Sequence, residues 1–263
     1  MTALTRYLRT LTEAETLDEA WRLHVAKMAD YGFDRLLYGY TRHLTPSSTG
    51  DIRDAVVLSN HSREYLAGYI GRGLYRNAPM LAWARANTRP VSWALLDAWM
   101  AEGRLSAAEC AVVAFNRRLG VVAGYSISFR EVSPRFGGVV SLCARAGMTQ
   151  AEVETLWARE GETIVLLNNV AHLKFTRLPC PNGRRLTRRQ REVLEWVADG
   201  KTMQEAALIL GVSPGTVEKH LRNAREALGA GTTAQALVKA AMANQVFTLR
   251  GLEPSAADLR EAG

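Results

Sequence analysis

Hydrophobic and polar positions follow two patterns along this chain of 263 residues, and the first pattern runs from residue 1 to about 175. Apolar residues repeated every three or four positions predict helices at 17–32, 62–75, 106–120 and 149–175. Stretches rich in β-branched and aromatic residues, or starting extended after a proline, predict strands at 35–44, 55–60, 89–96, 121–132 and 137–146.

The order of these elements predicts the fold class of the region. The last two strands are separated by a short Ser-Pro turn, so we expect them to form a hairpin. The strict alternation of strands and helices that a doubly wound parallel sheet needs is absent. We therefore expect an α+β chain whose first region is an α-β-α sandwich around a mostly antiparallel five-stranded sheet.

The second pattern consists of four short helices with a start or stop signal at each joint. Thr187 and Thr202 each precede a Gln or Glu by three positions, which is the spacing of a capping box. Ser213 precedes a proline at the first position of the next helix, and a fourth helix is expected at 232–244. The predicted organisation is a domain at 1–175, a Pro-, Gly- and Arg-containing linker at 176–185, a four-helix domain at 186–250 and a tail at 251–263.

The middle pair of these helices predicts a helix-turn-helix. Gly211 and Val212 form a turn short enough to force a sharp crossing, and Val217 and Leu221 place one face of the next helix inward. Cations on the other face are typical of a helix that enters the major groove of DNA. We expect contacts to double-stranded DNA from Lys201, Thr202, Ser213, Thr216, Glu218, Lys219, His220, Arg222 and Arg225.

Side-chain chemistry divides these contacts into two kinds. Arg222 can donate two hydrogen bonds to guanine, and Glu218 can accept one from cytosine. Lys201, Lys219 and His220, with the arginines at 184, 185, 188, 189 and 191, are expected on phosphates. The charge distribution supports DNA binding by this region. Residues 184–250 contain eleven Lys and Arg and six Asp and Glu, which gives a net charge of +5 out of +7 for the whole chain. The alternative is a small helical bundle whose charges are merely solvated.

Residues 186–230, "LTRRQREVLEWVADGKTMQEAALILGVSPGTVEKHLRNAREALGA", resemble the DNA-binding domain of LuxR-type transcription regulators. The resemblance extends over about 60 residues. Gln190 departs from it, because the family usually has Glu there. The resemblance implies a dimer that binds a palindromic operator, with the predicted helix 149–175 as a plausible dimer surface.

The first 175 residues resemble the autoinducer-binding domain of quorum-sensing LuxR proteins. The spacing of Tyr65, Tyr69, Ala78–Pro79, Trp93 and Gly124 matches positions where that family usually has Trp, Tyr, Asp–Pro, Trp and Gly. In the family, the Asp accepts the amide N–H of an acyl-homoserine lactone and the first Trp donates to the lactone carbonyl. Ala78 cannot accept with its side chain, and Tyr65 donates from a different point.

Three readings of the ligand site follow from these departures. The pocket binds a lactone through another acceptor, such as Asn77, Ser126 or Ser141; it binds a different apolar molecule; or it binds nothing and its core is filled. Leu37, Tyr38, Tyr40, Val57 and Ser126 are expected to form the wall on the sheet. The candidate ligand-binding residues are Tyr65, Tyr69, Asn77, Ala78, Pro79, Trp93, Gly124, Ser126, Ser141, Tyr38, Tyr40 and Val57.

Composition limits the remaining function classes. Cys110, Cys143 and Cys180 are an odd, sparse set that predicts reduced thiols, and neither they nor the five histidines have metal-ligand spacing. We expect that the protein uses no cofactor and is not an enzyme. The rival classes are a lactone-processing enzyme and a ligand-independent DNA-binding protein. With no apolar run of membrane-span length and no signal-peptide pattern, we expect a cytoplasmic protein without a membrane partner.

Overall fold

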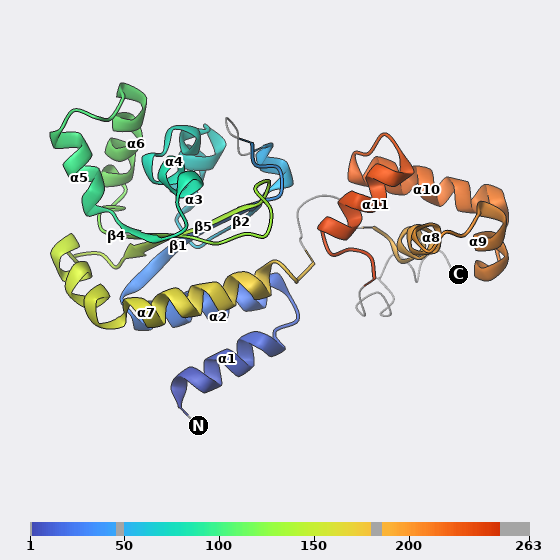
Figure 1. Cartoon of the computed structure of the whole chain (residues 1–263), viewed down its shortest axis with the longest axis horizontal. Coiled ribbons are helices and arrows are strands. Elements are labelled where there is room, and N and C mark those ends of the chain that lie inside the picture. The colour runs from blue at the N-terminus through green and yellow to red at the C-terminus, as the bar shows by residue number, and fades with distance from the viewer. Residues whose placement is uncertain (1, 46–49, 180–185, 248–263) are drawn as a thin grey trace. The chain divides into compact units, whose positions relative to one another are not determined.

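The structure, a computed structural model, describes residues 2–45, 50–179 and 186–247 and divides into two compact units between Thr176 and Arg177. Helices cover both faces of a sheet in the N-terminal unit, and the regular elements of the C-terminal unit are all helices within residues 186–247 (Figure 1). The predicted α+β class and the predicted α-β-α sandwich are therefore confirmed. Cys180, the predicted linker residues 180–185 and the predicted tail 251–263 lie outside the described residues.

Five antiparallel strands form the sheet in the order β2-β1-β5-β4-β3. Leu37 lies opposite Ser141, and Ser141 lies opposite Ser126, so these three side chains share one face of the sheet. The strands are shorter than several predicted stretches. Their bounds are β1 Phe33–Thr41, β2 Val56–Ser59, β3 Pro90–Ser92, β4 Gly124–Ser128 and β5 Gly137–Ala144.

Helices α2 (Leu17–Asp30) and α7 (Gln150–Phe175) cover one face of this sheet, and α1 (Ala3–Glu13) packs against these two helices (Figure 1). The sequence predicted α2 and α7 but not α1. A buried hydrogen-bond chain joins all three helices: the Tyr7 hydroxyl lies 2.8 Å from Nδ1 of His24, and Nε2 of His24 lies 2.9 Å from Oδ1 of Asn168. Because an amide oxygen only accepts, Nε2 carries the ring proton and Nδ1 accepts from Tyr7.

The opposite face carries shorter helices, two of which the sequence did not predict, α4 and α5. The predicted helix 62–75 is broken into an α-helical turn, a π-helical segment and a 3₁₀ turn, and its glycines account for the irregularity. The bounds are η1 Ile52–Asp54, α3 Arg63–Leu66, η2 Ala67–Gly71, η3 Leu74–Asn77, α4 Pro79–Ala86, α5 Ala94–Ala101 and α6 Ala107–Arg118.

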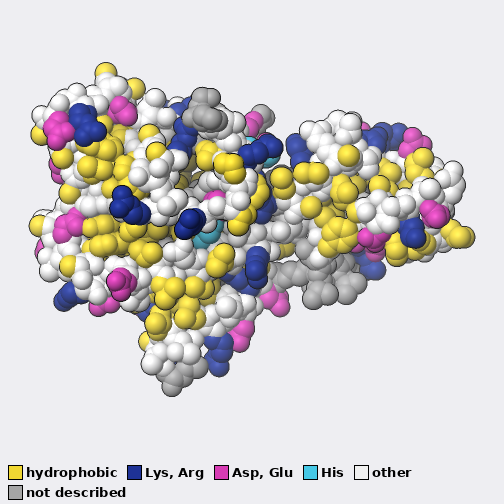
Figure 2. Space-filling model, in the orientation of Figure 1, with side chains coloured by type: hydrophobic (Ala, Val, Ile, Leu, Met, Phe, Trp, Pro, Cys, Tyr) yellow, Lys and Arg dark blue, Asp and Glu magenta, His cyan; other side chains and the backbone are white. Residues whose placement is uncertain are grey.

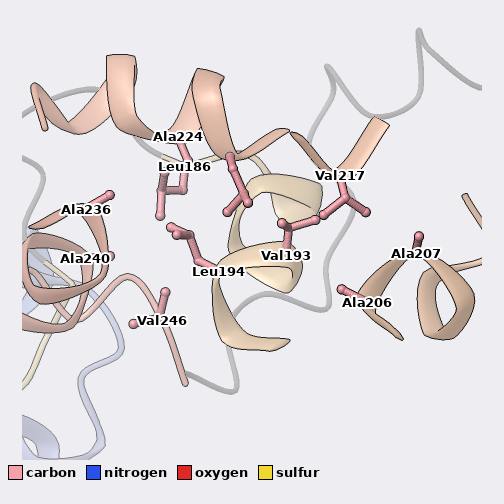
Figure 3. Packing of buried hydrophobic residues seen from close by; sticks show 11 residues of the cluster. Leu186, Val193, Leu194, Ala206, Ala207, Val217, Ala224, Ala236, Ala240 and Val246 are labelled. Atoms are coloured by element: carbon pink, nitrogen blue, oxygen red, sulfur yellow. The ribbon is translucent and has the colours of Figure 1, made fainter. Parts of the chain in front are cut away.

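The C-terminal unit consists of α8 Arg188–Ala198, α9 Met203–Leu210, α10 Pro214–Leu228 and α11 Thr233–Met242. The predicted caps are present: Thr187 and Thr202 form capping boxes, Ser213 accepts from the Thr216 N–H, and Gly211 adopts a left-handed φ of 67°. Small apolar side chains from all four helices meet in one buried cluster, which includes Leu194, Ala206, Val217 and Ala236 (Figure 3). The close approach that these small residues permit holds α10 against α8 and α9.

None of the helices in the described ranges is long and apolar enough to cross a lipid bilayer.

Candidate ligand cavity and DNA-binding helix

A cavity of about 560 Å³ lies in the N-terminal unit, which is within the usual size range of small-molecule sites. Its lining is mostly apolar and comes from the sheet, from η1 to η3, from α4 and from the β4–β5 hairpin, and it includes Leu37, Val57, Tyr69 and Met80. Gly39 also lines it, and a Cβ at that position would meet no atom within 4 Å. The cavity is therefore real open space directly above β1.

Tyr38 and Tyr40 lie in the cavity lining with Leu37 and Val57, as expected, whereas Ser126 does not. The rings of the two tyrosines also contact α7: the Tyr38 hydroxyl lies 2.9 Å from Nδ1 of His172, and the Tyr40 ring packs edge-on against the same histidine. Because alternate side chains of a strand point to opposite faces, the two tyrosines project from the face of β1 opposite to Leu37.

The residues at the family-like spacing surround a second, much smaller cavity of about 50 Å³. Tyr65, Tyr69, Ala78, Pro79 and Trp93 all line it. Leu37, Tyr69, Met80 and Ser141 line both cavities, so the two adjoin there.

An aromatic stack fills the space next to Ala78. The His61 and Tyr65 rings are stacked at 4.3 Å, and Tyr65 stacks on Tyr69 at 5.2 Å. Tyr65 is buried, and its hydroxyl donates to Oδ1 of Asn116 on α6 across 3.3 Å. Burial, followed by the nearby charge of Arg35, lowers the pKa of His61 to about 4, and burial raises the pKa of both tyrosines. The stack is neutral at pH 7.

The polar groups of Trp93, Ser126 and Ser141 form hydrogen bonds with one another. The indole Nε1 of Trp93 donates to the Ser126 hydroxyl across 3.0 Å, and that hydroxyl lies 3.3 Å from the Ser141 hydroxyl. Gly124 has a packing role: a Cβ there would press on the carbonyl oxygen of Leu142 and the ring of Trp93. Of these residues, Ser141 lines both cavities and Trp93 the smaller one, whereas Gly124 and Ser126 lie behind them.

Replacement acceptors for the missing carboxylate at Ala78 are scarce. Asn77 is exposed and lines neither cavity, so the expectation that it substitutes as an acceptor does not fit its position. Ser126 is fully buried and engaged by Trp93. Among the three side chains that the sequence suggested, Ser141 alone borders the larger cavity.

Sequence reasoning missed Glu131, which also lines the larger cavity. Its Oε1 lies 2.9 Å from Nε2 of His172, with the two side chains 12% and 6% exposed. A carboxylate two positions after Phe129, at the end of an otherwise apolar strand, was the available signal. Because alternate side chains of an extended strand point the same way, Glu131 lies on the same side as Phe129, whose ring stacks on His172.

The candidate DNA-contacting side chains gather on α10 and at the start of α9. Lys201 and Thr202 are exposed at the α9 N-terminus, and Ser213 is exposed at the α10 N-terminus. Glu218, Lys219 and Arg222 are exposed on α10 and make no ion pair with any described residue. Their charged groups are therefore available to another molecule.

Three other candidates for DNA contact are less exposed than expected, and two of them form hydrogen bonds within the domain. Arg225 is half-buried and donates to the Thr233 hydroxyl on α11 across 3.1 Å, so it does not simply point outward. Thr216 is half-buried with its hydroxyl 2.9 Å from that of Ser213, and His220 is also half-buried. Of the arginines expected on phosphates, Arg188 and Arg189 pair with Glu192 at 2.8 and 2.9 Å, Arg191 is partly buried, and 184 and 185 lie outside the described residues.

Comparison with known families decides what this combination of units is. Residues 16–175 match the model of the autoinducer binding domain, and residues 184–240 match the model of bacterial regulatory proteins of the luxR family. The chain belongs to the LuxR family of transcription regulators. It carries an autoinducer-binding domain followed by a LuxR-type helix-turn-helix, as the sequence predicted.

Relatives of this LuxR-family regulator are transcriptional activators. It is 24% identical over 230 residues to the transcriptional activator protein AnoR of Acinetobacter nosocomialis, covering 86% of this chain and 91% of AnoR. It is 21% identical over 196 residues to the transcriptional activator protein LuxR of Aliivibrio fischeri, covering 73% and 76%. The crystal structure of Escherichia coli SdiA shares the fold, with a TM-score of 0.51, 18% identity and coverage of 93% of this chain and all of that one.

Proposed function

We propose that this LuxR-family regulator binds an apolar small molecule in its 560 Å³ cavity and that binding changes its affinity for DNA. The observation that carries the proposal is the open space above Gly39, beside a smaller cavity filled by the His61–Tyr65–Tyr69 stack. A filled core would leave no such space, which argues against a sensor that binds nothing. The missing acceptor at Ala78 favours a signal other than an acyl-homoserine lactone held in the family's usual way.

DNA binding is proposed to occur through α10 in the major groove. Arg222 and Glu218 would read base edges, with Lys201, Lys219 and His220 on phosphates. Serine and threonine hydroxyls at the helix N-termini add neutral contacts to the backbone of the duplex. The N-terminal turn of α10 is fixed by the Ser213 cap, which holds these side chains in register.

A homodimer on a palindromic operator completes the proposal. Hydrophobic side chains gather on the outer surface of the α2–α7 layer (Figure 2), and Leu166 and Leu173 on α7 are 57% and 60% exposed. Positions seven residues apart lie on one side of a helix, so the two leucines suit a helix–helix contact. A two-fold dimer would bind two half-sites about one helical turn apart. Because its proposed partner is DNA, we expect the regulator to act in the cytoplasm.

Mass spectrometry of the full chain purified from its native host tests the sensor proposal. Spectra are recorded under native conditions and after solvent extraction. We expect a stoichiometric small molecule that is released by solvent and identified by its mass. A mass without any bound small molecule, on a folded protein that still binds DNA, would instead support a ligand-independent regulator.

A further inference from the structure

Glu131 gives the mostly apolar cavity one acidic side chain, the sole one among the described residues of its lining. It follows β4, and Gly138 lies beside it on β5. A Cβ at Gly138 would come within 2.9 Å of His172 Cε1 and 3.2 Å of Glu131 Oε1. The glycine therefore leaves the space in which the Glu131–His172 pair sits on the sheet.

The hydrogen bonds of this carboxylate are incomplete. Oε1 is buried and 2.9 Å from Nε2 of His172, yet no described residue gives it a well-aligned hydrogen bond. The opposite ring nitrogen of His172 is engaged by the Tyr38 hydroxyl, which holds the ring in place. A carboxylate that is mostly removed from water and only partly paired gains substantially from an additional donor.

We propose that Glu131 is the polar recognition point of the cavity, and that it accepts a hydrogen bond from a hydroxyl or amine group on the signal molecule. This inference rests on the proposed function of the cavity as a ligand site. The apolar body of the ligand lies along Leu37, Tyr69 and Met80 on the opposite face of the sheet. Thr41 and Gly137, at the paired ends of β1 and β5, also line the cavity, so the ligand would reach Glu131 past the end of the sheet. Recognition is thereby moved from the position of Ala78 to the β4–β5 hairpin.

A cationic side chain also borders the cavity, and it would favour a ligand of the opposite charge preference. Arg85 on α4 lines the cavity, is exposed, and donates to the carbonyl oxygen of Thr45 across 2.9 Å. If Arg85 set the specificity, a carboxylic acid would be the preferred ligand. Because Arg85 is exposed to water and already hydrogen-bonded, whereas Glu131 is only 12% exposed, the carboxylate is the stronger determinant.

Four probes with one tail and different head groups separate these possibilities: octylamine, 1-octanol, methyl octanoate and octanoic acid. Binding of each to the solvent-extracted full chain is measured by calorimetry. The wild type is compared with Glu131→Gln, with Glu13→Gln as a control at an exposed site on α1, and with Gly39→Val, which fills the cavity. We expect octylamine and 1-octanol to bind at least about tenfold more tightly than methyl octanoate, and octanoic acid to bind most weakly.

Glu131→Gln should reduce the advantage of octylamine at least about tenfold, whereas Glu13→Gln should leave it unchanged. Equal binding of the amine, the alcohol and the ester, or tightest binding of octanoic acid, would overturn the role of Glu131 while leaving the sensor intact. If no probe binds, or if Gly39→Val leaves all binding unchanged, the cavity itself is not the ligand site and the proposed function fails. Should Glu131→Gln not fold, the order of the four probes on the wild type decides.

Discussion

The indole nitrogen of Trp93 donates a hydrogen bond to the Ser126 hydroxyl across 3.0 Å, so two residues expected to face a ligand are bound to each other. Both are buried, and the Ser126 hydroxyl lies 3.3 Å from that of Ser141. Trp93, Tyr65 and Ala78 border the same cavity of about 50 Å³, which leaves little room for a polar head group.

Restoring the family's usual carboxylate at the position of Ala78 should therefore not restore lactone binding. Ala78→Asp places an acid against a cavity of about 50 Å³, where burial without a partner costs about 1–3 kcal/mol. We expect a lower thermal midpoint for Ala78→Asp than for the isosteric Ala78→Asn. Neither variant should be stabilised by N-octanoyl-homoserine lactone in thermal unfolding. An Ala78→Asp protein as stable as the wild type, and stabilised further by the lactone, would show that the head-group site is open.

Filling the larger cavity should separate ligand binding from folding. Gly39 lies in β1 with open space where its Cβ would be, and valine is favoured in strands. Gly39→Val should keep or raise the stability of the extracted protein, by up to about 1 kcal/mol, because glycine in a strand is destabilising. The thermal shift that native ligand gives the wild type should be lost. A ligand-induced shift of wild-type size in Gly39→Val would place the ligand elsewhere.

Acid should destabilise the N-terminal unit through His24. Burial, opposed by the hydrogen bond to Asn168, lowers the pKa of His24 to about 4 from its ordinary 6.5. The folded state then binds fewer protons than the unfolded state between these values, so this contribution is complete above pH 6.5 and declines as pH falls towards 4. From pH 7 to pH 5 the loss should be roughly 2 kcal/mol.

Urea unfolding of His24→Gln at both pH values checks this assignment. Glutamine can still accept from Tyr7 and donate to Asn168 but does not titrate in this range. We expect the variant's free energy of unfolding to change less with pH than that of the wild type. Identical changes in the two proteins would remove His24 as the cause.

Two arginines on α10 should respond differently to truncation. Arg222→Ala should weaken binding to the preferred DNA by about 1–3 kcal/mol and relax its sequence preference, with no change in stability. Arg225→Ala removes the bond to Thr233 and should lower the stability of the C-terminal unit by about 0.5–1.5 kcal/mol. Fluorescence anisotropy on specific and scrambled duplexes, with thermal unfolding, distinguishes the two. Equal losses on both duplexes for Arg222→Ala would argue against base contacts.

Charge on the exposed face of α7 should dissociate the proposed dimer. Leu173→Glu, alone or with Leu166→Glu, places a charge where a partner helix would bury an apolar side chain. We expect sedimentation to show a dimer for the wild type and a monomer for the double variant. The charge-free change Leu173→Met should preserve the dimer. A double variant that still sediments as a dimer would move the interface away from this face.

The fold was predictable where local signals are strong. Ser and Thr caps predicted the four C-terminal helices, and stretches rich in β-branched and aromatic residues predicted most of the strands. The predicted strand 89–96 is a strand only at Pro90–Ser92, because helix α5 begins at Ala94. Helix α1 was missed because its apolar face shows only when Tyr7 and Leu11 pack on α2 and α7. The π-helical turn at Ala67–Gly71 follows from tertiary packing, since Gly68 admits the Phe115 ring. Neither feature has a distinct period in the sequence.

The ligand site was predictable in its location but not in its chemistry. Spacing identified Tyr65, Tyr69, Ala78 and Trp93 as neighbours, and they do surround one small cavity. Of the residues expected on the sheet wall, Leu37, Tyr38, Tyr40 and Val57 line the larger cavity and Ser126 does not. Glu131 becomes notable only when the β4–β5 hairpin brings it to His172, forty-one residues later in the chain.

One measurement tests the central account directly: the affinity of the full chain for a selected DNA duplex with and without its ligand. A duplex is first selected from random sequences, and binding is measured before extraction, after extraction and after the extracted material is returned. The account predicts a reversible change of at least about fivefold in the wild type and none in Gly39→Val. The same affinity for the loaded and the extracted wild type would contradict it.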